Sequence, residues 1–342
     1  MSKKFVFLIL ICFAIIVAGC SKKEEAESAG KSKAIEASIE DASYFIAEMD
    51  EGSASDEDTG LLAVEMKVKN LTDSGLDVFP SRSFKLYDGD QEIDANSDAT
   101  YELGSETGSI GAKKSKNLKV AFTVEKDKKY DLAIRTMSAK GEEEEVKLKL
   151  DTSEYNQSFE KLEDPAKALT AYIETIYLDK ENADYEKLVT ADKAVLQDDA
   201  KKLFKEGLDR VFYDGVPDKE IDKFYSGFQS ALSEKAELNT ETVSNIGDKA
   251  VVNLEYTALP LNDMSDMVRD YQEEYRDKNG YDNDKANAYA MSKFDAMINK
   301  LEPKSGSDYK IKMIQKDGKW TIDSSDYNSE SLVETFAKGS IY

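Results

Sequence analysis

Apolar and polar side chains alternate along much of the first half of the chain. From Leu62 to Val68 every second residue is apolar, and charged residues such as Glu65 and Lys67 lie between them. A period of two is typical of a strand that buries one face. The segments that repeat this alternation are 118–124, 130–134 and 146–150. Because turn-forming residues separate these segments, the pattern predicts an all-β sandwich over residues 34–151.

The period of the pattern changes in the second half. Apolar side chains at helical spacing predict a helix that begins at Asp164, a second over about residues 195–212, and a third that begins at Pro217. Asp164 is expected to cap the first of these helices, with Pro165 at its first helical position.

Strands and further helices are expected after the third helix. In sequence order they are a strand over 240–246, a strand over 250–258, helices over 264–276 and 284–301, and a hairpin of 309–315 with 320–323. Gly247-Asp248 is the expected turn of the first strand pair. Helices followed by antiparallel strands predict an α+β domain over residues 162–335.

The N-terminus has the features of an export signal. Lys3 and Lys4 precede an uncharged run from Phe5 to Val17, which is shorter than the roughly 20 residues that a membrane-spanning helix needs. Small residues then lead to Gly19 and Cys20. This arrangement resembles the bacterial lipobox, in which the cysteine is acylated, for example with palmitate, and the bond before it is cleaved. The alternatives are an ordinary signal peptide with a chance cysteine, or an uncleaved anchor.

The cysteine count agrees with the lipobox. Of the two cysteines, Cys12 lies inside the expected signal peptide, residues 1–19, so the mature protein keeps only Cys20. Two acyl chains are enough for stable anchoring. Residues 20–33 are rich in Lys, Glu, Ser, Ala and Gly, and they are expected to form a flexible tether. The expected location is therefore the cell membrane, at its extracytoplasmic face.

Charge and composition exclude some functions. The sequence is acidic, with a formal net charge of −23, so the protein would repel nucleic acid. It contains no histidine, which is the most frequent general acid or base and the most frequent metal ligand. We expect no cofactor, no metal and no catalytic residue, although tyrosines such as Tyr172, Tyr256 and Tyr271 are abundant. Tyr172 and Trp320 are expected to be core residues.

Two groups of acidic residues are candidates for a calcium site. They are Asp277, Asn279, Asp282 and Asp284, and Asp88, Asp90 and Glu92. Neither follows the EF-hand spacing, and such groups arise by chance in an acidic protein. Asn70-Leu71-Thr72 has the form of a glycosylation sequon, but we expect it to be a turn.

The first predicted domain resembles the telokin-like, immunoglobulin-type domain of many Gram-positive lipoproteins. The residues that carry the resemblance are 62–73, 83–88, 118–124 and 129–132. The resemblance implies an immunoglobulin-like sandwich. That domain has no known function and no catalytic residues that could be transferred to this protein.

The second predicted domain resembles the nuclear transport factor 2-like fold, in which helices pack on a curved antiparallel sheet. The closing residues 316–322, Lys-Asp-Gly-Lys-Trp-Thr-Ile, are frequent at the end of such domains. The whole layout is similar to a family of two-domain lipoproteins of Bacilli. The helices expected between the two hairpins depart from the simplest form of the fold.

Three kinds of function remain open. The first, which we favour, is a non-catalytic binding or interaction module on the cell surface, with another cell-envelope protein as its partner. The second is a lipoprotein that carries a small ligand in a pocket of the second domain. The third is an enzyme that uses a carboxyl group of raised pKa in that pocket, without histidine.

Overall fold

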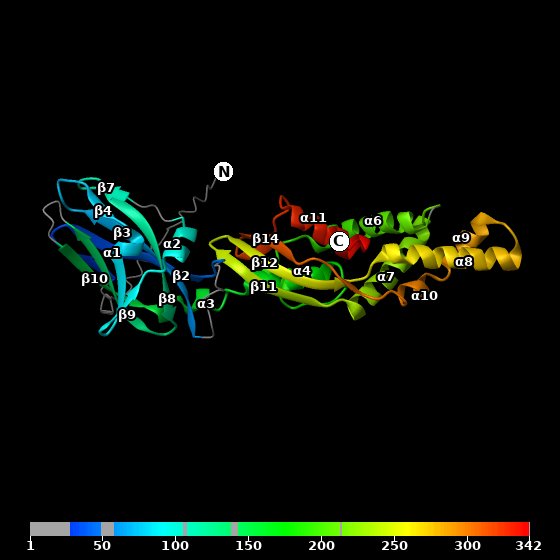
Figure 1. Cartoon of the computed structure of the whole chain (residues 1–342), viewed down its shortest axis with the longest axis horizontal. Helices are drawn as coiled ribbons and strands as arrows, with labels where there is room; N and C mark the ends of the chain where they lie inside the picture. The colour runs from blue at the N-terminus through cyan, green and yellow to red at the C-terminus, as the bar shows by residue number, and fades with distance from the viewer. Residues whose placement is uncertain (1–27, 49–57, 105–107, 138–142, 213, 342) are drawn as a thin grey trace, which may run out of the picture.

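The described residues form two parts that lie end to end (Figure 1). The computed structural model describes residues 28–48, 58–104, 108–137, 143–212 and 214–341. Residues 28–162 are called the N-terminal part below, and residues 163–341 the C-terminal part. Each part has its own large hydrophobic core. All the sheets in these residues are antiparallel, so the fold combines antiparallel sheets with helices.

Two four-stranded sheets make up most of the N-terminal part, in the orders β1-β2-β3-β8 and β10-β9-β5-β6. Their strands are β1 (Ala29–Lys31), β2 (Ile35–Phe45), β3 (Thr59–Asn70), β5 (Phe84–Asp88), β6 (Gln91–Asp94), β8 (Ser115–Glu125), β9 (Lys129–Met137) and β10 (Glu143–Asp151). A separate two-stranded sheet pairs β4 (Leu76–Val78) with β7 (Gly108–Ile110).

The predicted alternation sets the register of these strands. β3 pairs with β8 so that Leu62 lies opposite Phe122 and Val64 opposite Val120. All four side chains are fully buried, and they face a core that also contains Leu132 and other residues of the second sheet. The two sheets therefore enclose one core, as the sequence pattern predicts.

Short helices close the ends of this part. They are α1 (Pro80–Ser83), α2 (Ser97–Glu102), the 3-10 helix η1 (Thr152–Tyr155) and α3 (Asn156–Phe159). Helix α2 is not predicted from the sequence pattern. Asn96 caps this helix by accepting a hydrogen bond from the Ala99 N–H at 3.0 Å, and Ala99 is buried.

The prediction that residues 20–33 form a tether is wrong from Ala29 onward. Residues 29–31 are strand β1, which pairs with residues 36–38 of β2. Gly30 allows this close packing, because a Cβ atom on it would lie 2.7 Å from a methyl carbon of Val146. Hydrogen bonds to β2 and packing against β10 therefore hold residues 29–31 in place, although this segment has few apolar side chains. Residues 1–27, including Gly19 and Cys20, lie outside the described residues.

The C-terminal part is built on the sheet β11-β12-β14-β15, with helices over it and beyond it (Figure 1). Its strands are β11 (Leu238–Ile246), β12 (Lys249–Ala258), β13 (Lys304–Ser305), β14 (Tyr309–Lys316) and β15 (Lys319–Ile322). Its helices are α4 (Asp164–Ile176), α5 (Tyr185–Leu188), α6 (Lys193–Val211), α7 (Asp218–Lys235), η2 (Leu261–Asp263), α8 (Met264–Asn279), α9 (Asn283–Met291), α10 (Phe294–Ile298) and α11 (Tyr327–Lys338). Both predicted hairpins are present.

Three predictions about this part need correction. Residues 284–301 are not one helix, because the backbone turns between α9 and α10. The turn brings Phe294 to stack on Phe224 with ring centroids 4.3 Å apart, and Phe294 is buried. Glu163, not Asp164, is the N-cap of α4, and Asp164 lies in the first turn without a capping hydrogen bond. The predicted limit at residue 335 falls inside α11, an unpredicted helix.

Helix α11 closes the core of the C-terminal part. Its Leu332 and Phe336 are buried, and Lys338 forms ion pairs with Glu334 at 2.6 Å and with Glu206 of α6 at 3.2 Å. The C=O of Gly339 accepts a hydrogen bond from the N–H of Leu261 at 3.1 Å. Residues 327–339 are thus an integral part of the folded structure.

Candidate binding site at the junction between the two parts

A short contact joins the two parts beside the hairpin of β11 and β12. Ile46 and Asn245 exchange backbone hydrogen bonds of 3.2 and 2.9 Å, and the Asn245 side chain donates to the Leu162 C=O at 3.0 Å. Ile246 packs against a small apolar cluster of the N-terminal part that includes Phe45 and Leu61. An ion pair between Lys310 and Glu48 also crosses the junction.

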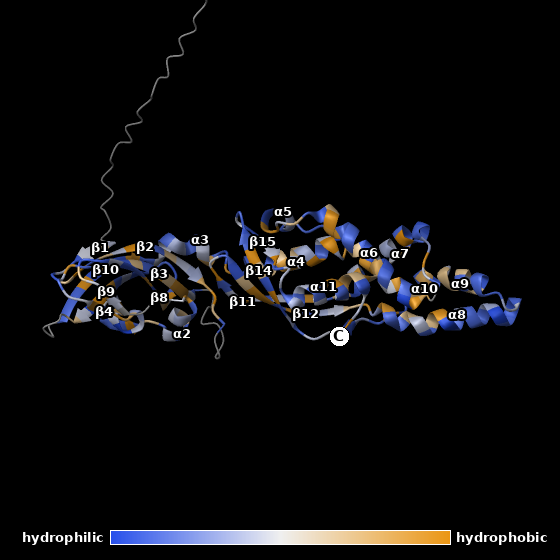
Figure 2. Ribbon diagram, turned by 90° about the horizontal axis from the view of Figure 1, so that it is seen from above, coloured by the Kyte–Doolittle hydropathy of each residue, from blue (hydrophilic) through white to orange (hydrophobic). Residues whose placement is uncertain are grey.

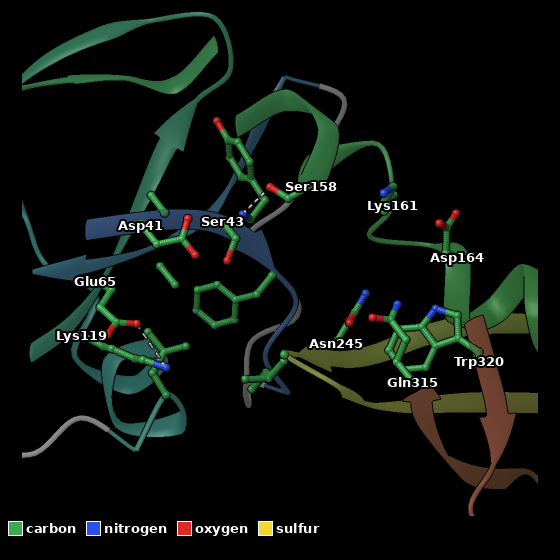
Figure 3. A pocket seen from close by; sticks show the side chains of 17 residues that line it. Asp41, Ser43, Glu65, Lys119, Ser158, Lys161, Asp164, Asn245, Gln315 and Trp320 are labelled. Carbon is green, nitrogen blue, oxygen red and sulfur yellow. Dashed lines mark hydrogen bonds and ion pairs between the residues drawn. The ribbon is translucent and has the colours of Figure 1, made fainter. Parts of the chain in front are cut away.

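A cavity of about 410 Å³ lies beside this contact, and both parts contribute its walls (Figure 3). The N-terminal part supplies residues of β2, β3 and β8. The C-terminal part supplies the start of α4, the tip of the β11–β12 hairpin, and the ends of β14 and β15. The polar and aromatic residues labelled in Figure 3 are Asp41, Ser43, Glu65, Lys119, Ser158, Lys161, Asp164, Asn245, Gln315 and Trp320.

The walls of this junction cavity carry charges of both signs. Asp41, Glu65 and Asp164 are acidic, and Lys119 and Lys161 are basic. Glu65 and Lys119 approach to 3.9 Å within the N-terminal part. A cavity that offers both carboxylates and ammonium groups can hold a polar ligand through several charge-assisted hydrogen bonds.

Asp164 is the most enclosed of these charged groups. Only 18% of its side chain is exposed, and it pairs with Lys167 at 3.7 Å. Burial raises the pKa of Asp164 above its ordinary value, and Lys167 and Lys161 only partly offset this effect. The sequence pattern marks Asp164 only as a helix cap and gives no sign of its place in a cavity.

Trp320 and Tyr172 are core residues, as predicted. Their exposed fractions are 2% and 6%, and both belong to the core of the C-terminal part. Trp320 also borders the junction cavity, and its backbone C=O accepts a hydrogen bond from the Thr190 N–H at 2.9 Å. Tyr172 meets Tyr177 edge to face.

Aromatic side chains fill the space between the sheet and helices α4 and α11. Tyr172, Tyr177, Phe336, Tyr256 and Tyr309 form a continuous row, with neighbouring ring centroids 5.4 to 6.0 Å apart. Burial raises the pKa of Tyr256 to about 12, so this phenol stays protonated at neutral pH. The fully buried polar residues of the described ranges include no Asp or Glu that could serve as a base beside these phenols.

The two acidic groups weighed as calcium sites are used within the protein. Asp282 caps α9 by accepting a hydrogen bond from the Lys285 N–H at 3.1 Å, and it pairs with the Lys285 ammonium at 2.8 Å. In the other group, Asp88 pairs with Lys128 at 2.7 Å. Within the described ranges, no three His, Cys, Asp or Glu residues are grouped as a metal ion would require.

Asn70, the last residue of β3, holds the turn that follows it, as expected, and is not an accessible glycosylation site. It is fully buried. Its Nδ2 donates to the C=O of Ser74 at 2.8 Å and of Ile110 at 2.9 Å, while its Oδ1 accepts from the N–H of Thr72 at 2.8 Å. The side chain therefore satisfies backbone groups that the turn leaves unpaired.

None of the helices among the residues that the structure describes is long and apolar enough to cross a membrane.

Comparison with known proteins places the protein in a family. The model of the family described as a domain of unknown function (DUF5105) matches residues 155–337, more than half of the sequence. The chain therefore belongs to the DUF5105 family.

A relative with a similar sequence is found in Bacillus subtilis. The sequence is 29% identical over 350 residues to the uncharacterized lipoprotein YcdA of Bacillus subtilis (strain 168), and the match covers 98% of this chain and 97% of that protein. The crystal structure of ycdA from Bacillus subtilis subsp. subtilis str. 168 superposes with a TM-score of 0.70 at 28% identity, over 91% of this chain and 99% of that one. The similarity thus extends across both parts.

Proposed function

We propose that this protein is a lipoprotein, held by lipid on Cys20 at the extracytoplasmic face of the cytoplasmic membrane, and that it is a non-catalytic binding module. The small residues before Cys20 and the similarity to a lipoprotein over nearly the whole length support the anchor. The two four-stranded sheets support a telokin-like domain over residues 34–151. The helices on an antiparallel sheet support a nuclear transport factor 2-like domain over residues 162–335.

The junction cavity is the observation that carries the binding role. Ligand sites form preferentially where two folded units meet, and this cavity has walls from both parts and charges of both signs. A polypeptide segment of another cell-envelope protein offers backbone donors and acceptors together with acidic and basic side chains. Such a segment is the occupant that we propose.

The alternative of a small-ligand carrier requires an open cavity inside the C-terminal part. The row of aromatic rings from Tyr172 to Tyr309 occupies the space between sheet and helices where that ligand would have to bind. The same rings occupy the place that an acid/base enzyme would need for its substrate. The packing therefore favours a binding site between the parts over one inside the second part.

The anchor is tested by labelling cells with an alkyne-bearing palmitate. We expect label on the full-length protein and none on a Cys20→Ala variant, which should also leave the membrane fraction. Label that persists on Cys20→Ala, or a wild-type protein that is unlabelled and released, would refute lipidation at this residue.

The binding site is tested by photo-cross-linking on intact cells. A photoreactive side chain is placed at Ser43 or Gln315 in the junction cavity, and at Met137, which is 72% exposed on the N-terminal part, as a control. We expect one protein partner to be cross-linked from both junction positions and not from Met137. Equal products from all three positions, or none from Ser43 and Gln315, would contradict the proposed site.

A further inference from the structure

A second concave site lies among the helices of the C-terminal part. It is a cleft of about 270 Å³ between Asp179 in the segment after α4, the first half of α6, and α7. Figure 1 shows α6 and α7 farther from the N-terminal part than the labelled strands of the C-terminal sheet. The cleft shares no lining residue with the junction cavity. An occupant of this helical cleft would thus be independent of the binding role proposed above.

Tyr225 places an unpartnered hydroxyl group at this cleft. The residue is only 7% exposed, and its ring packs on Phe204 with centroids 5.2 Å apart. Its hydroxyl is buried and has no hydrogen-bond partner among the described residues. Most buried polar groups in native proteins have a partner, because leaving one unpaired is costly. A group that stays unpaired at the wall of a cleft is a candidate contact for a ligand.

The Tyr225 side chain forms part of the wall of the cleft. Burial raises the pKa of Tyr225, and the negative charge of Asp179 raises it further. Asp179 is itself a lining residue of the cleft. Tyr225 and Asp179 therefore share the wall of the cleft, and the Tyr225 ring packs on Phe204 in the core.

The charges around this hydroxyl are mostly negative. Asp222 is compensated by Lys201 at 3.0 Å. Asp179 and Asp198 also line the cleft, and neither forms an ion pair with another described residue. Asp179 and Asp198 thus add negative charge to the wall of the cleft that also contains the unpartnered hydroxyl, and these groups together favour a cation.

The chemistry of the cleft favours an organic cation over a metal ion. The described residues contain no group of three metal-binding side chains, here or elsewhere. A primary ammonium group carries three N–H donors. Two of them can be accepted by carboxylates and the third by the Tyr225 hydroxyl. We propose that the helical cleft binds the primary ammonium group of a small amine, through Asp179, Asp198 and Tyr225.

Titration calorimetry on the full mature protein tests this proposal with butylammonium and 1,4-diaminobutane as probes. Tetramethylammonium is the matched control probe, because it has the same charge as butylammonium but no N–H donor. We expect the two primary amines to bind and tetramethylammonium to bind at least about tenfold more weakly, because it cannot form hydrogen bonds to the charged groups. Absence of binding by both amines, or equal affinity for tetramethylammonium, would overturn the proposal.

Two variants separate this site from general attraction to an acidic protein. Tyr225→Phe removes the unpartnered hydroxyl and keeps the ring, so the fold should be unaffected while amine affinity falls by about tenfold. Tyr185→Phe removes another buried hydroxyl, which donates to the Ala191 C=O at 3.3 Å, and should leave affinity unchanged. Asp179→Asn should weaken binding at least as much as Tyr225→Phe does. Unchanged affinity in both cleft variants would show that the amines bind elsewhere.

Discussion

The backbones of Ile46 and Asn245 hydrogen-bond to each other in both directions, at 3.2 and 2.9 Å, across the junction of the two parts. This single residue pair is an antiparallel bridge outside the named strands. Next to it Ile246 packs on an apolar cluster that includes Phe45, and Ile246 and Phe45 also line the charged cavity. The contact is narrow compared with the cores on either side, so the junction is a place where small changes can alter the relative position of the parts.

Replacing Ile246 by Asp should loosen the junction without unfolding either part. The half-buried Ile246 side chain packs near Phe45 and Leu61, and losing this apolar contact should cost about 1–3 kcal/mol of docking free energy. Small-angle X-ray scattering should show a larger spread of overall dimensions, while circular dichroism stays unchanged. The control is Asp248→Asn, in the exposed turn of the same hairpin. Identical scattering from Ile246→Asp and wild type would show that Ile246 does not hold the parts together.

Replacing Asn70 by Ala should destabilise the N-terminal part by about 2–4 kcal/mol. The substitution removes the amide that donates to the buried Ile110 C=O and accepts from the Thr72 N–H, and each buried group left unpaired costs about 1–3 kcal/mol. Chemical denaturation measures the change. Asn117→Ala is the matched control, since its exposed amide bonds to Glu65 at 3.2 Å and its loss should cost about 0.5 kcal/mol or less. Equal effects of the two variants would contradict the structural role of Asn70.

Alanine at Gly207 should weaken the attachment of the C-terminal helix. A Cβ atom at Gly207 would lie 2.9 Å from the backbone oxygen of Lys338, so α6 and α11 would have to separate. Overpacking of this kind typically costs about 1–3 kcal/mol. Limited proteolysis followed by mass spectrometry should show earlier cleavage within residues 327–341.

Gly247→Ala supplies the control for this effect. Gly247 has a φ of +65° and nothing within 4 Å of the Cβ position. Alanine at this position would therefore cost only the strain of a left-handed backbone, about 1 kcal/mol. If Gly247→Ala released the C-terminus as readily as Gly207→Ala, close packing at Gly207 would not be the cause.

Two aspartates should affect stability with opposite dependence on pH. Burial raises the pKa of Asp164 above its ordinary value of 3.8, so its ionised form disfavours folding above that pH. Asp164→Asn should therefore stabilise the protein at neutral pH, and this gain should disappear as the pH falls through the raised pKa toward 3.8. Thermal unfolding across this range measures the effect.

Asp151 has the reverse sign. The Ser153 hydroxyl, and then Lys129, lower the pKa of Asp151 below 3.8, so its ionised form favours folding above that pH. Asp151→Asn should lose stability at neutral pH, and the difference from wild type should vanish as the pH falls below 3.8 toward the lowered pKa. Parallel curves for Asp151→Asn and Asp164→Asn would contradict both assignments.

Local patterns were enough to predict most strands and long helices. The alternation around Val64 and Val120, and the turn residues Gly247 and Asp248, each specify their structure through neighbouring residues. The wrong predictions concern segments whose structure depends on tertiary contacts. Strand β1 exists because β2 pairs with it, and the break before Phe294 exists because Phe224 receives that side chain. Neither partner can be read from the segment itself.

The junction cavity could not be predicted for a related reason. Its walls combine Asp41 with Gln315 and Glu65 with Asn245, which are far apart in the sequence, and no motif marks any of them. Trp320 was correctly assigned to the core because it lies on a predicted strand. Its position at the edge of the cavity depends on how the two parts meet, which the strand pattern does not show. The Tyr225 hydroxyl was missed because the helical pattern marks Tyr225 only as an apolar position.

The closing position of α11 (Figure 2) has a consequence for the order in which the protein matures. A ribosome makes the polypeptide from its N-terminus, and folded units generally form in that order. The sheets of the N-terminal part are complete once residue 151 has been made. The core of the C-terminal part is complete only after Phe336 has been made, because this side chain packs between Tyr177 and Tyr256. These three residues are spread over almost half the sequence. A polypeptide that stops a dozen residues early would thus have a finished first half and a second half with its aromatic interior open to water.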